Sequence, residues 1–270
     1  MELFIYIILG IIQGFTEPLP ISSSGHIFLF KNVFNTNMFN DLNFEIVANF
    51  GSFLAILFIF RKDVIELINA FFGYIFKKDK REKYKKNFKY CLYIIVSTIP
   101  VGIVGILLKD FVENKLQNIT FLGFAFLLTA LMLFLIRNRN GVKDDKDITL
   151  KDAVIIGLIQ VITIMPGISR SGTVLVACLL CGMKRATALK YTFILYFPIS
   201  CATMLLGVSD LIDSGNLTNL LVPYLSGLAA ALIITYFTYK WLSELVKKGK
   251  LWKFSIYCIC LALFIFIYFR

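Results

Sequence analysis

The sequence is poor in charge and contains a single histidine, and the shortage of charge excludes most soluble functions. Charged residues make up 17% of the 270 residues, while apolar residues reach 58% and the mean hydropathy is +0.78. Soluble globular proteins carry about 25% charged residues. Long apolar runs with few charges are typical of membrane-spanning helices. A soluble enzyme and a disordered chain are therefore excluded as leading interpretations, and the composition predicts an all-α, polytopic membrane protein.

The cysteines and the first residues do not indicate a secreted, disulfide-bonded protein. All six cysteines lie in or beside apolar runs, and Cys178 and Cys181, although spaced as CxxC, lack the second ligand pair of a structural zinc site. We interpret these two as small buried apolar residues. Residues 1–10 have no basic segment before their apolar run, so we expect them to belong to the mature protein.

Positive charge amounts to +11 overall, but it is concentrated in the connections between apolar runs. Residues 61–89 hold ten Lys and Arg against four acids, and residues 137–151, 184–190 and 240–253 are basic as well. This distribution follows the positive-inside rule for cytoplasmic loops, so it predicts contact with anionic lipid head groups and no nucleic-acid partner. Residues 63–76 are amphipathic and are expected along the inner membrane interface.

Six apolar runs are long enough to span a bilayer, and two further regions are interrupted. The predicted spans are residues 44–60, 90–108, 119–136, 187–207, 220–241 and 253–269. Residues 3–34 and 153–183 carry EPLPISSSGH (17–26) and PGISRSG (166–172) in their middle. Irregular backbone at membrane depth must be buried in protein or line a watery cavity. Both regions are therefore predicted to be re-entrant helix-loop-helix hairpins.

The two interrupted regions are copies of each other at an offset of 147 residues. Residues 9–26 and 156–173 share eight identities in eighteen positions, among them Gln13 with Gln160 and Ser22 with Ser169. Loop charge orients the two copies oppositely, so their tips are expected to meet near mid-membrane. The sequence thus predicts one integral membrane domain with inverted-topology repeats. Its parts are repeat 1 (about 1–60), a basic cytoplasmic loop (61–89), repeat 2 (about 153–207) and C-terminal spans (220–269), within 1–270.

Polar side chains gather at both tips, although a charged group within a bilayer costs about 2.5–3.5 kcal/mol. Arg170 offers a planar fork for phosphate oxygens, and Gln13 and Glu17 lie four residues apart on one helical face. Beside phosphates, Glu17 is expected to hold a divalent cation, Mg²⁺ or Ca²⁺. The predicted set of substrate-binding residues is Gln13, Ser22, Ser24, Ser169, Arg170, Ser171 and Thr173.

Glu17, Ser23, His26 and Arg170 are the candidate catalytic residues. His26 could move a proton near neutral pH, and Ser23, His26 or a water molecule could attack phosphorus. Plainer interpretations stand beside these, because Glu17 and Arg170 could form a structural ion pair and serines could only cap helices. Broken helices in inverted repeats are also transporter architecture. A transporter or flippase of an anionic lipid or solute is therefore the alternative function, and a purely structural membrane partner is the third.

The segments QGFTEPLPISSSGH and PGISRSG resemble the two signature regions of the undecaprenyl-diphosphate phosphatase family of the bacitracin-resistance type. FEIVANFGSFLAIL and GMKRATALKYTFILYFP extend the resemblance along nearly the whole chain. The resemblance implies a multi-pass enzyme of the bacterial inner membrane that hydrolyses undecaprenyl diphosphate to undecaprenyl phosphate and inorganic phosphate. It also implies recycling of the lipid carrier for cell-wall synthesis, bacitracin resistance, dependence on a divalent metal and a site reached from the outer face. A homodimer is left open.

Carried over by position, the resemblance departs from the family pattern at two places. Gln13 occupies the first of two acidic positions, where the family accepts Glu or Gln, so a metal would be held by Glu17 and the phosphates alone. Val174 stands where the family usually has threonine, and Thr173 lies one place earlier. The matching positions are Ser22 and Ser23 for the paired serines, His26 for the histidine, and Ser169, Arg170 and Ser171 for SRS.

Overall fold

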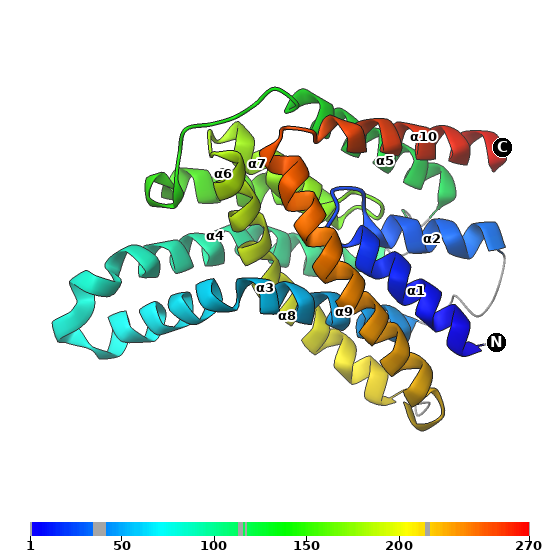
Figure 1. Cartoon of the computed structure of the whole chain (residues 1–270), viewed down its shortest axis with the longest axis horizontal. Helices are drawn as coiled ribbons and strands as arrows, with labels where there is room; N and C mark the ends of the chain where they lie inside the picture. Colours follow the sequence, from blue (N-terminus) through cyan, green and yellow to red (C-terminus); the bar gives the residue numbers. More distant parts are fainter. Residues whose placement is uncertain (1, 35–41, 113–115, 117, 214–216, 270) are drawn as a thin grey trace.

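The computed structural model describes residues 2–34, 42–112, 116, 118–213 and 217–269, and within these ranges the fold is all-helical (Figure 1). An isolated β-bridge between Lys143 and Met183 is the only extended pairing in the described part of the chain. The helices are α1 (Glu2–Thr16), α2 (Ser23–Phe34), α3 (Leu42–Phe76), α4 (Arg81–Phe111), α5 (Ile119–Leu135), α6 (Leu150–Gln160), α7 (Arg170–Leu180), α8 (Arg185–Asp213), α9 (Leu217–Lys247) and α10 (Trp252–Tyr268).

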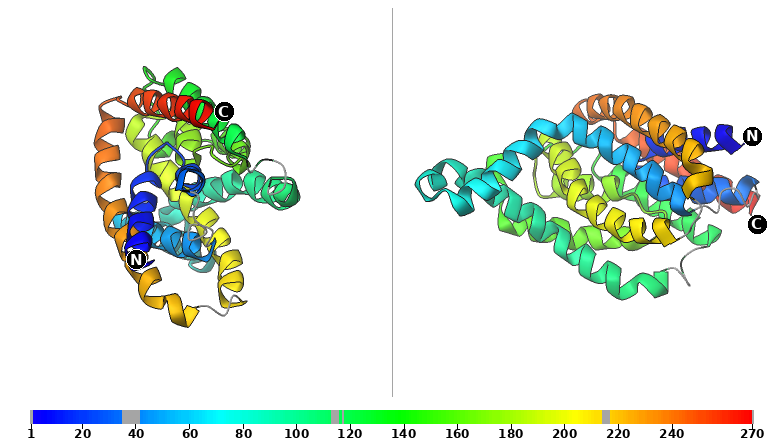
Figure 2. Two further views of the ribbon diagram at one scale, coloured as in Figure 1. Left: turned by 90° about the vertical axis from the view of Figure 1, so that its right-hand side faces the viewer. Right: turned by 90° about the horizontal axis from the view of Figure 1, so that it is seen from below.

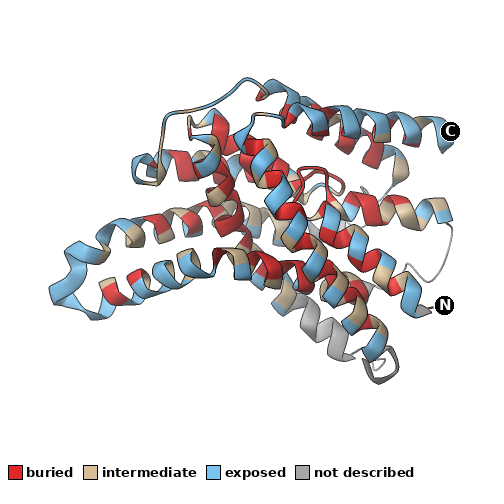
Figure 3. Cartoon of the chain, in the orientation of Figure 1, coloured by how far each residue is buried: buried red, intermediate tan, exposed pale blue. Residues whose placement is uncertain are grey.

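The lengths and composition of these helices confirm the prediction of a helical membrane protein. Segments of α3, α4, α8 and α9 are long and apolar enough to cross a bilayer, and each of these four helices contains one of the predicted spans. The other two predicted spans correspond to α5 and α10, which are apolar but have 17 residues each. Large apolar side chains are exposed on the outer faces of the helices, while buried residues gather where the helices meet (Figure 3). This distribution suits a surface that faces lipid.

The basic segment 61–89 is mostly helical, contrary to the loop expected there. α3 continues to Phe76 and α4 begins at Arg81, so the two helices extend together beyond the rest of the molecule (Figures 1 and 2). Aromatic side chains join the extensions, with the Tyr74 and Phe88 ring centroids 4.1 Å apart. Their repeating apolar positions at helical spacing explain why the helices do not end at the first basic residue.

Proline and backbone geometry explain why the chain breaks at the two signature segments. Between α1 and α2, Pro18 and Pro20 cannot continue a helix, and Ser22 adopts a left-handed conformation with φ of 68°. Between α6 and α7, a short 3-10 turn (Val161–Ile164) precedes Pro166 and Gly167, and the φ of Gly167 is 87°. Each break therefore leaves two short helices, and none of the four is long enough to span a bilayer by itself.

The helix that follows each break, α2 or α7, begins with the same serine cap. The Ser22 Oγ accepts a hydrogen bond from the Gly25 N–H at 3.2 Å, and the Ser169 Oγ accepts one from the Gly172 N–H at 3.1 Å. Both contacts join an N-cap serine to the third helical residue, a common way of satisfying a free amide at a helix start. These serines lie 147 residues apart, the offset of the sequence repeat.

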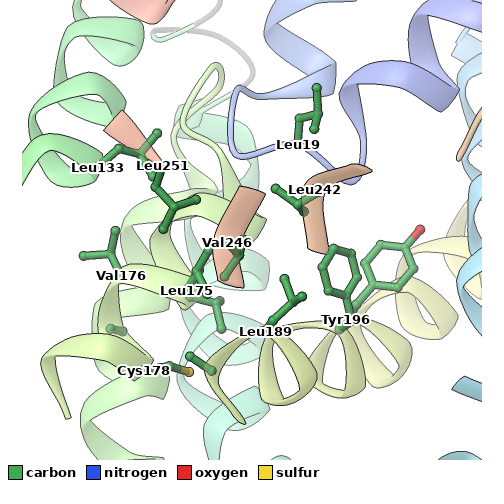
Figure 4. Close-up of a cluster of buried hydrophobic side chains, with 14 of the residues drawn as sticks. Leu19, Leu133, Leu175, Val176, Cys178, Leu189, Tyr196, Leu242, Val246 and Leu251 are labelled. Carbon is green, nitrogen blue, oxygen red and sulfur yellow. The ribbon is translucent and has the colours of Figure 1, made fainter. Parts of the chain in front are cut away.

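Close backbone contacts and one buried helix hold the bundle together. α1 lies directly against α9, where a side chain added at Gly10 would come within 2.2 Å of the Gly227 carbonyl oxygen. α7 is surrounded by other helices, and residues 172–179 are all buried. Figure 4 shows Leu175, Val176 and Cys178 packed with side chains of α9 and the segment that follows it, such as Leu242. In lipid, such close packing takes the place of a hydrophobic driving force between helices.

Candidate active site

The loops that follow α1 and precede α7 meet in the middle of the bundle (Figure 1). The Ser171 Oγ donates a hydrogen bond of 3.0 Å to the Leu19 carbonyl oxygen, which joins the start of α7 to the first loop. Gly172 lies so close to Pro20 that an added Cβ would come within 3.1 Å of the proline Cβ. The close fit of the two loops places their polar side chains in one cluster.

Glu17 is at the centre of this cluster. Its Oε1 accepts a hydrogen bond of 2.9 Å from the Arg170 Nη2, an ion pair that joins the two loops. Its Oε2 accepts hydrogen bonds from the Ser23 hydroxyl and, at 3.0 Å, from the Gln13 Nε2. The Glu17 side chain is only 9% exposed, so its charge depends on these partners. The side chain amide of Asn49 in α3 completes the group by accepting from Gln13 at 2.6 Å.

Arg170 is held between the carboxylate and an aromatic ring. Its guanidinium carbon lies 4.6 Å from the centroid of the Tyr196 ring in α8, in a cation–π arrangement, and its side chain is 29% exposed. A guanidinium has five N–H donors, and the ion pair with Glu17 uses one nitrogen. Arg170 therefore has donors left for oxygens of a bound anion.

These side chains border a cavity of about 350 Å³. Its polar lining includes Glu17, Asn49, Gln160, Arg170, Tyr196 and the serines 22–24, 169 and 171, together with hydroxyls of Thr163, Thr192, Ser200 and Thr203. Its apolar wall includes Ile56 of α3, Val101 of α4, and Ile199 and Met204 of α8. A cavity lined by both a polar cluster and aliphatic side chains suits an amphipathic ligand.

His26 lies apart from this cavity, although the sequence places it among the catalytic candidates. It is buried in α2, where its Nδ1 lies 2.7 Å from the Ser22 carbonyl oxygen and its Nε2 lies 2.8 Å from the Tyr257 hydroxyl of α10. The carbonyl can only accept, so Nδ1 carries a proton and donates to it, and the Tyr257 hydroxyl pairs with Nε2. In this arrangement His26 fixes the backbone of the first loop.

Thr173 is also absent from the cavity wall. It is fully buried, and its hydroxyl donates to the Ser169 carbonyl oxygen at 2.8 Å, within α7 and its cap. Val174, at the position where the resembled family has threonine, is a wall residue instead. Five of the predicted substrate-binding residues, at positions 22, 24, 169, 170 and 171, line the cavity. Gln13 is not among the lining residues and contacts one of them, Glu17.

Asn49 and Tyr196 are site residues that sequence reasoning missed. Each lies within a long apolar span, and they occupy equivalent positions of the repeat, 147 residues apart. A single polar amide in FEIVANFGSFLAIL is the signal that could have indicated Asn49. Tyr196 gives no comparable signal, because the large apolar ring of a tyrosine does not stand out within an apolar segment.

The described residues contain no group of three or more His, Cys, Asp or Glu that could enclose a metal ion. Glu17 is the one carboxylate among the wall residues. This donor set does not suit a resident metal held by protein ligands alone. It does suit an ion such as Mg²⁺ that is bound mainly through substrate phosphates and water, with one carboxylate from the protein.

The fold and the site define a polytopic helical membrane protein with a buried carboxylate–guanidinium–serine cluster beside a largely aliphatic wall. The sequence profile of the bacitracin resistance protein BacA matches residues 6–264, so the chain belongs to the BacA family.

Similar proteins carry one functional name. The chain is 42% identical over 254 residues to undecaprenyl-diphosphatase 1 of Bacillus cereus, and the aligned region covers 94% of this chain and 93% of the relative. It is 41% identical over 265 residues to the undecaprenyl-diphosphatase of Oceanobacillus iheyensis, covering 97% and 95%. It is 38% identical over 253 residues to undecaprenyl-diphosphatase 1 of Halalkalibacterium halodurans, covering 94% and 91%.

Proposed function

We propose that this protein hydrolyses undecaprenyl diphosphate to undecaprenyl phosphate and inorganic phosphate. The observation that carries the proposal is the contact of Ser23 and Arg170 with the two oxygens of one buried carboxylate, Glu17, at the wall of a cavity. This arrangement provides a hydroxyl, a base and a cation within one hydrogen-bonded group. The names of the relatives and the family of bacitracin resistance proteins support this choice of substrate and a role in bacitracin resistance.

The diphosphate is held by Arg170 and by the N-termini of α2 and α7. Both helices begin at the cavity wall, where Ser23, Ser24, Arg170 and Ser171 occupy their first turns. Free N–H groups and the positive end of the helix dipole favour an anion at such a position. Arg170 adds its unused donors in a planar fork that matches phosphate oxygens. The aliphatic side chains that line the same cavity contact the start of the prenyl tail.

Ser23 is the nucleophile and Glu17 is its base. The Ser23 O–H already donates to the Glu17 Oε2, and the pairing of Oε1 with Arg170 holds the carboxylate in place. Glu17 takes the Ser23 proton as the Oγ attacks the terminal phosphorus. The bond from that phosphorus to the bridging oxygen breaks, and undecaprenyl phosphate leaves with the electron pair. Water then hydrolyses the phosphoserine, giving inorganic phosphate and restoring the Ser23 hydroxyl.

A divalent cation, Mg²⁺ or Ca²⁺, would enter with the diphosphate and bind Glu17 as its protein ligand. When bound, it neutralises charge on the phosphate oxygens. Asn49 also lines the cavity, and its Oδ1 accepts from the Gln13 Nε2, which holds Gln13 against Glu17.

The broken helices fit an inverted-repeat protein of the bacterial inner membrane. The matching serine caps at positions 22 and 169, together with the meeting of the two loops, support two equivalent re-entrant hairpins of opposite orientation. In that arrangement the site lies near mid-membrane, within reach of a lipid head group. A homodimer stays a prediction, which the mass of the purified complex in detergent would test.

The proposal is tested by measuring phosphate release from undecaprenyl diphosphate with purified protein in detergent. We expect Ser23→Ala to lower the rate at least 100-fold, because one catalytic nucleophile is lost. Ser255→Ala is the matched control, since Ser255 is buried in α10 outside the cavity wall and should leave the rate unchanged. If the wild type binds the lipid without releasing phosphate, the proposal is wrong and a transporter is the better description.

A further inference from the structure

Gln160 is a buried amide whose two polar side-chain atoms both lack a partner. Across the residues that the structure describes, neither its Nε2 nor its Oε1 has a hydrogen bond, and the residue has no exposed surface. Its backbone carbonyl is occupied, because the Thr163 hydroxyl donates to it at 2.8 Å. An unpaired buried amide is costly and uncommon in folded proteins, so a role outside the resting structure is indicated.

The repeat shows what is unusual about this amide. Gln160 is the counterpart of Gln13, whose side chain is fully engaged with Glu17 and Asn49. At the offset of 147 residues, those two partner positions are Ile164 and Tyr196. The second copy thus has the glutamine but neither of the side chains that satisfy it in the first copy. Tyr196 instead lies against Arg170.

Gln160 also belongs to the catalytic cavity. It is part of the same wall as Glu17, Ser23 and Arg170, and it reaches this wall from the end of α6, on the second hairpin. The other buried unpaired side-chain atoms of the described residues, the hydroxyls of Tyr90 and Ser255, lie outside this wall. Gln160 is therefore the unpaired amide that a ligand in the cavity could satisfy.

We infer that the carboxamide of Gln160 is a further ligand of the diphosphate head group, an inference that rests on the proposed function. The side chain rotates from the wall into the filled cavity, and its NH₂ donates to a phosphate oxygen. An amide adds hydrogen bonds without adding charge, so it strengthens binding of the anion without competing with Arg170 for Glu17. Its contribution is to binding and orientation, and the reacting atoms are left to Ser23.

The inference is tested with Gln160→Met, which keeps a long unbranched side chain and removes both polar atoms. We expect the KM for undecaprenyl diphosphate to rise about tenfold or more, as for loss of a hydrogen bond to a charged group, with kcat changed much less. Thermal stability in detergent should stay the same or increase, because an unpaired buried amide is removed. Binding of labelled substrate to Ser23→Ala should weaken by the same factor when Gln160→Met is added.

Tyr90→Phe is the matched control, because it also removes an unpaired buried polar atom but lies outside the cavity wall. It should leave KM unchanged. An unchanged KM and unchanged binding in Gln160→Met would overturn the inference while leaving the proposed hydrolysis intact. A lower melting temperature in Gln160→Met would also overturn it, because it would show a structural role. Failure of the wild type to hydrolyse the lipid would instead contradict the proposed function, and the binding measurement would still decide the role of Gln160.

Discussion

Replacing Arg170 with methionine tests whether its ion pair with Glu17 serves only the fold or also the binding of substrate. The change leaves Glu17, 9% exposed, without its cation, although Gln13 and Ser23 still donate to it. Removing one partner of a buried pair costs about 3–5 kcal/mol. Because Arg170 is 29% exposed and Glu17 keeps two donors, we expect the lower end, about 3 kcal/mol. That loss corresponds to a melting temperature lower by about 6–12 °C.

The double variant Glu17→Gln with Arg170→Met removes both charges at once. Its stability should return to within about 1 kcal/mol of the wild type, because no unpaired charge is left in the protein. Its phosphate release should nevertheless stay at least 100-fold below the wild type, since the base and the phosphate fork are both gone. Thermal unfolding in detergent and phosphate release from the same preparations measure the two quantities. Recovery of activity together with stability would refute the reasoning and make the pair purely structural.

Three further predictions concern packing, pH and metal. Gly10→Ala should lower the free energy of unfolding by about 1–3 kcal/mol, because the new Cβ would collide with the Gly227 carbonyl and push α1 away from α9. Thermal unfolding measures this loss, and an unchanged melting temperature would contradict the close contact. Burial alone raises the pKa of Asp152, but hydrogen bonds from Lys143 and Thr149 outweigh it and hold the pKa below its usual range. The stability that follows from this is fully present above the pKa of the unfolded state, about 3.9, and is lost as the pH falls below it. Asp152→Asn should therefore be less stable than the wild type at pH 7 and nearly equal to it in strong acid, which melting temperatures measured against pH would show. A chelator should abolish phosphate release and leave the melting temperature unchanged, because the donor set holds the ion through the substrate; a large loss of stability would indicate a resident metal.

The helix breaks and the meeting of the two loops could be predicted because they depend on local chemistry and on the repeat. Proline at positions 18, 20 and 166 ends helices wherever the chain lies, and the charges of Glu17 and Arg170, placed between apolar segments, need partners of opposite charge. Their ion pair is the contact that sequence reasoning had offered as a plainer interpretation, and it now coexists with a candidate catalytic serine on the same carboxylate.

The direction of His26 and the length of α3 could not be predicted from local sequence. His26 is turned toward Tyr257, which lies 231 residues further along the chain, and this choice depends on where α10 packs. The basic residues after position 60 indicate the membrane boundary, but they do not end a helix, because Lys and Arg are good helix formers. Beyond that point α3 is held by contacts far along the chain, since Asp63 pairs with Lys190 of α8 and Tyr74 stacks on Phe88 of α4.

The most direct test of the central claim is phosphate release by Glu17→Gln compared with the wild type, using undecaprenyl diphosphate and Mg²⁺ in detergent. This variant keeps the shape of the side chain and removes the base from Ser23 and the charge from the partner of Arg170. The account predicts a rate at least 100-fold lower, with the protein still folded. A wild-type rate in Glu17→Gln would contradict the assignment of this cavity as the hydrolytic site.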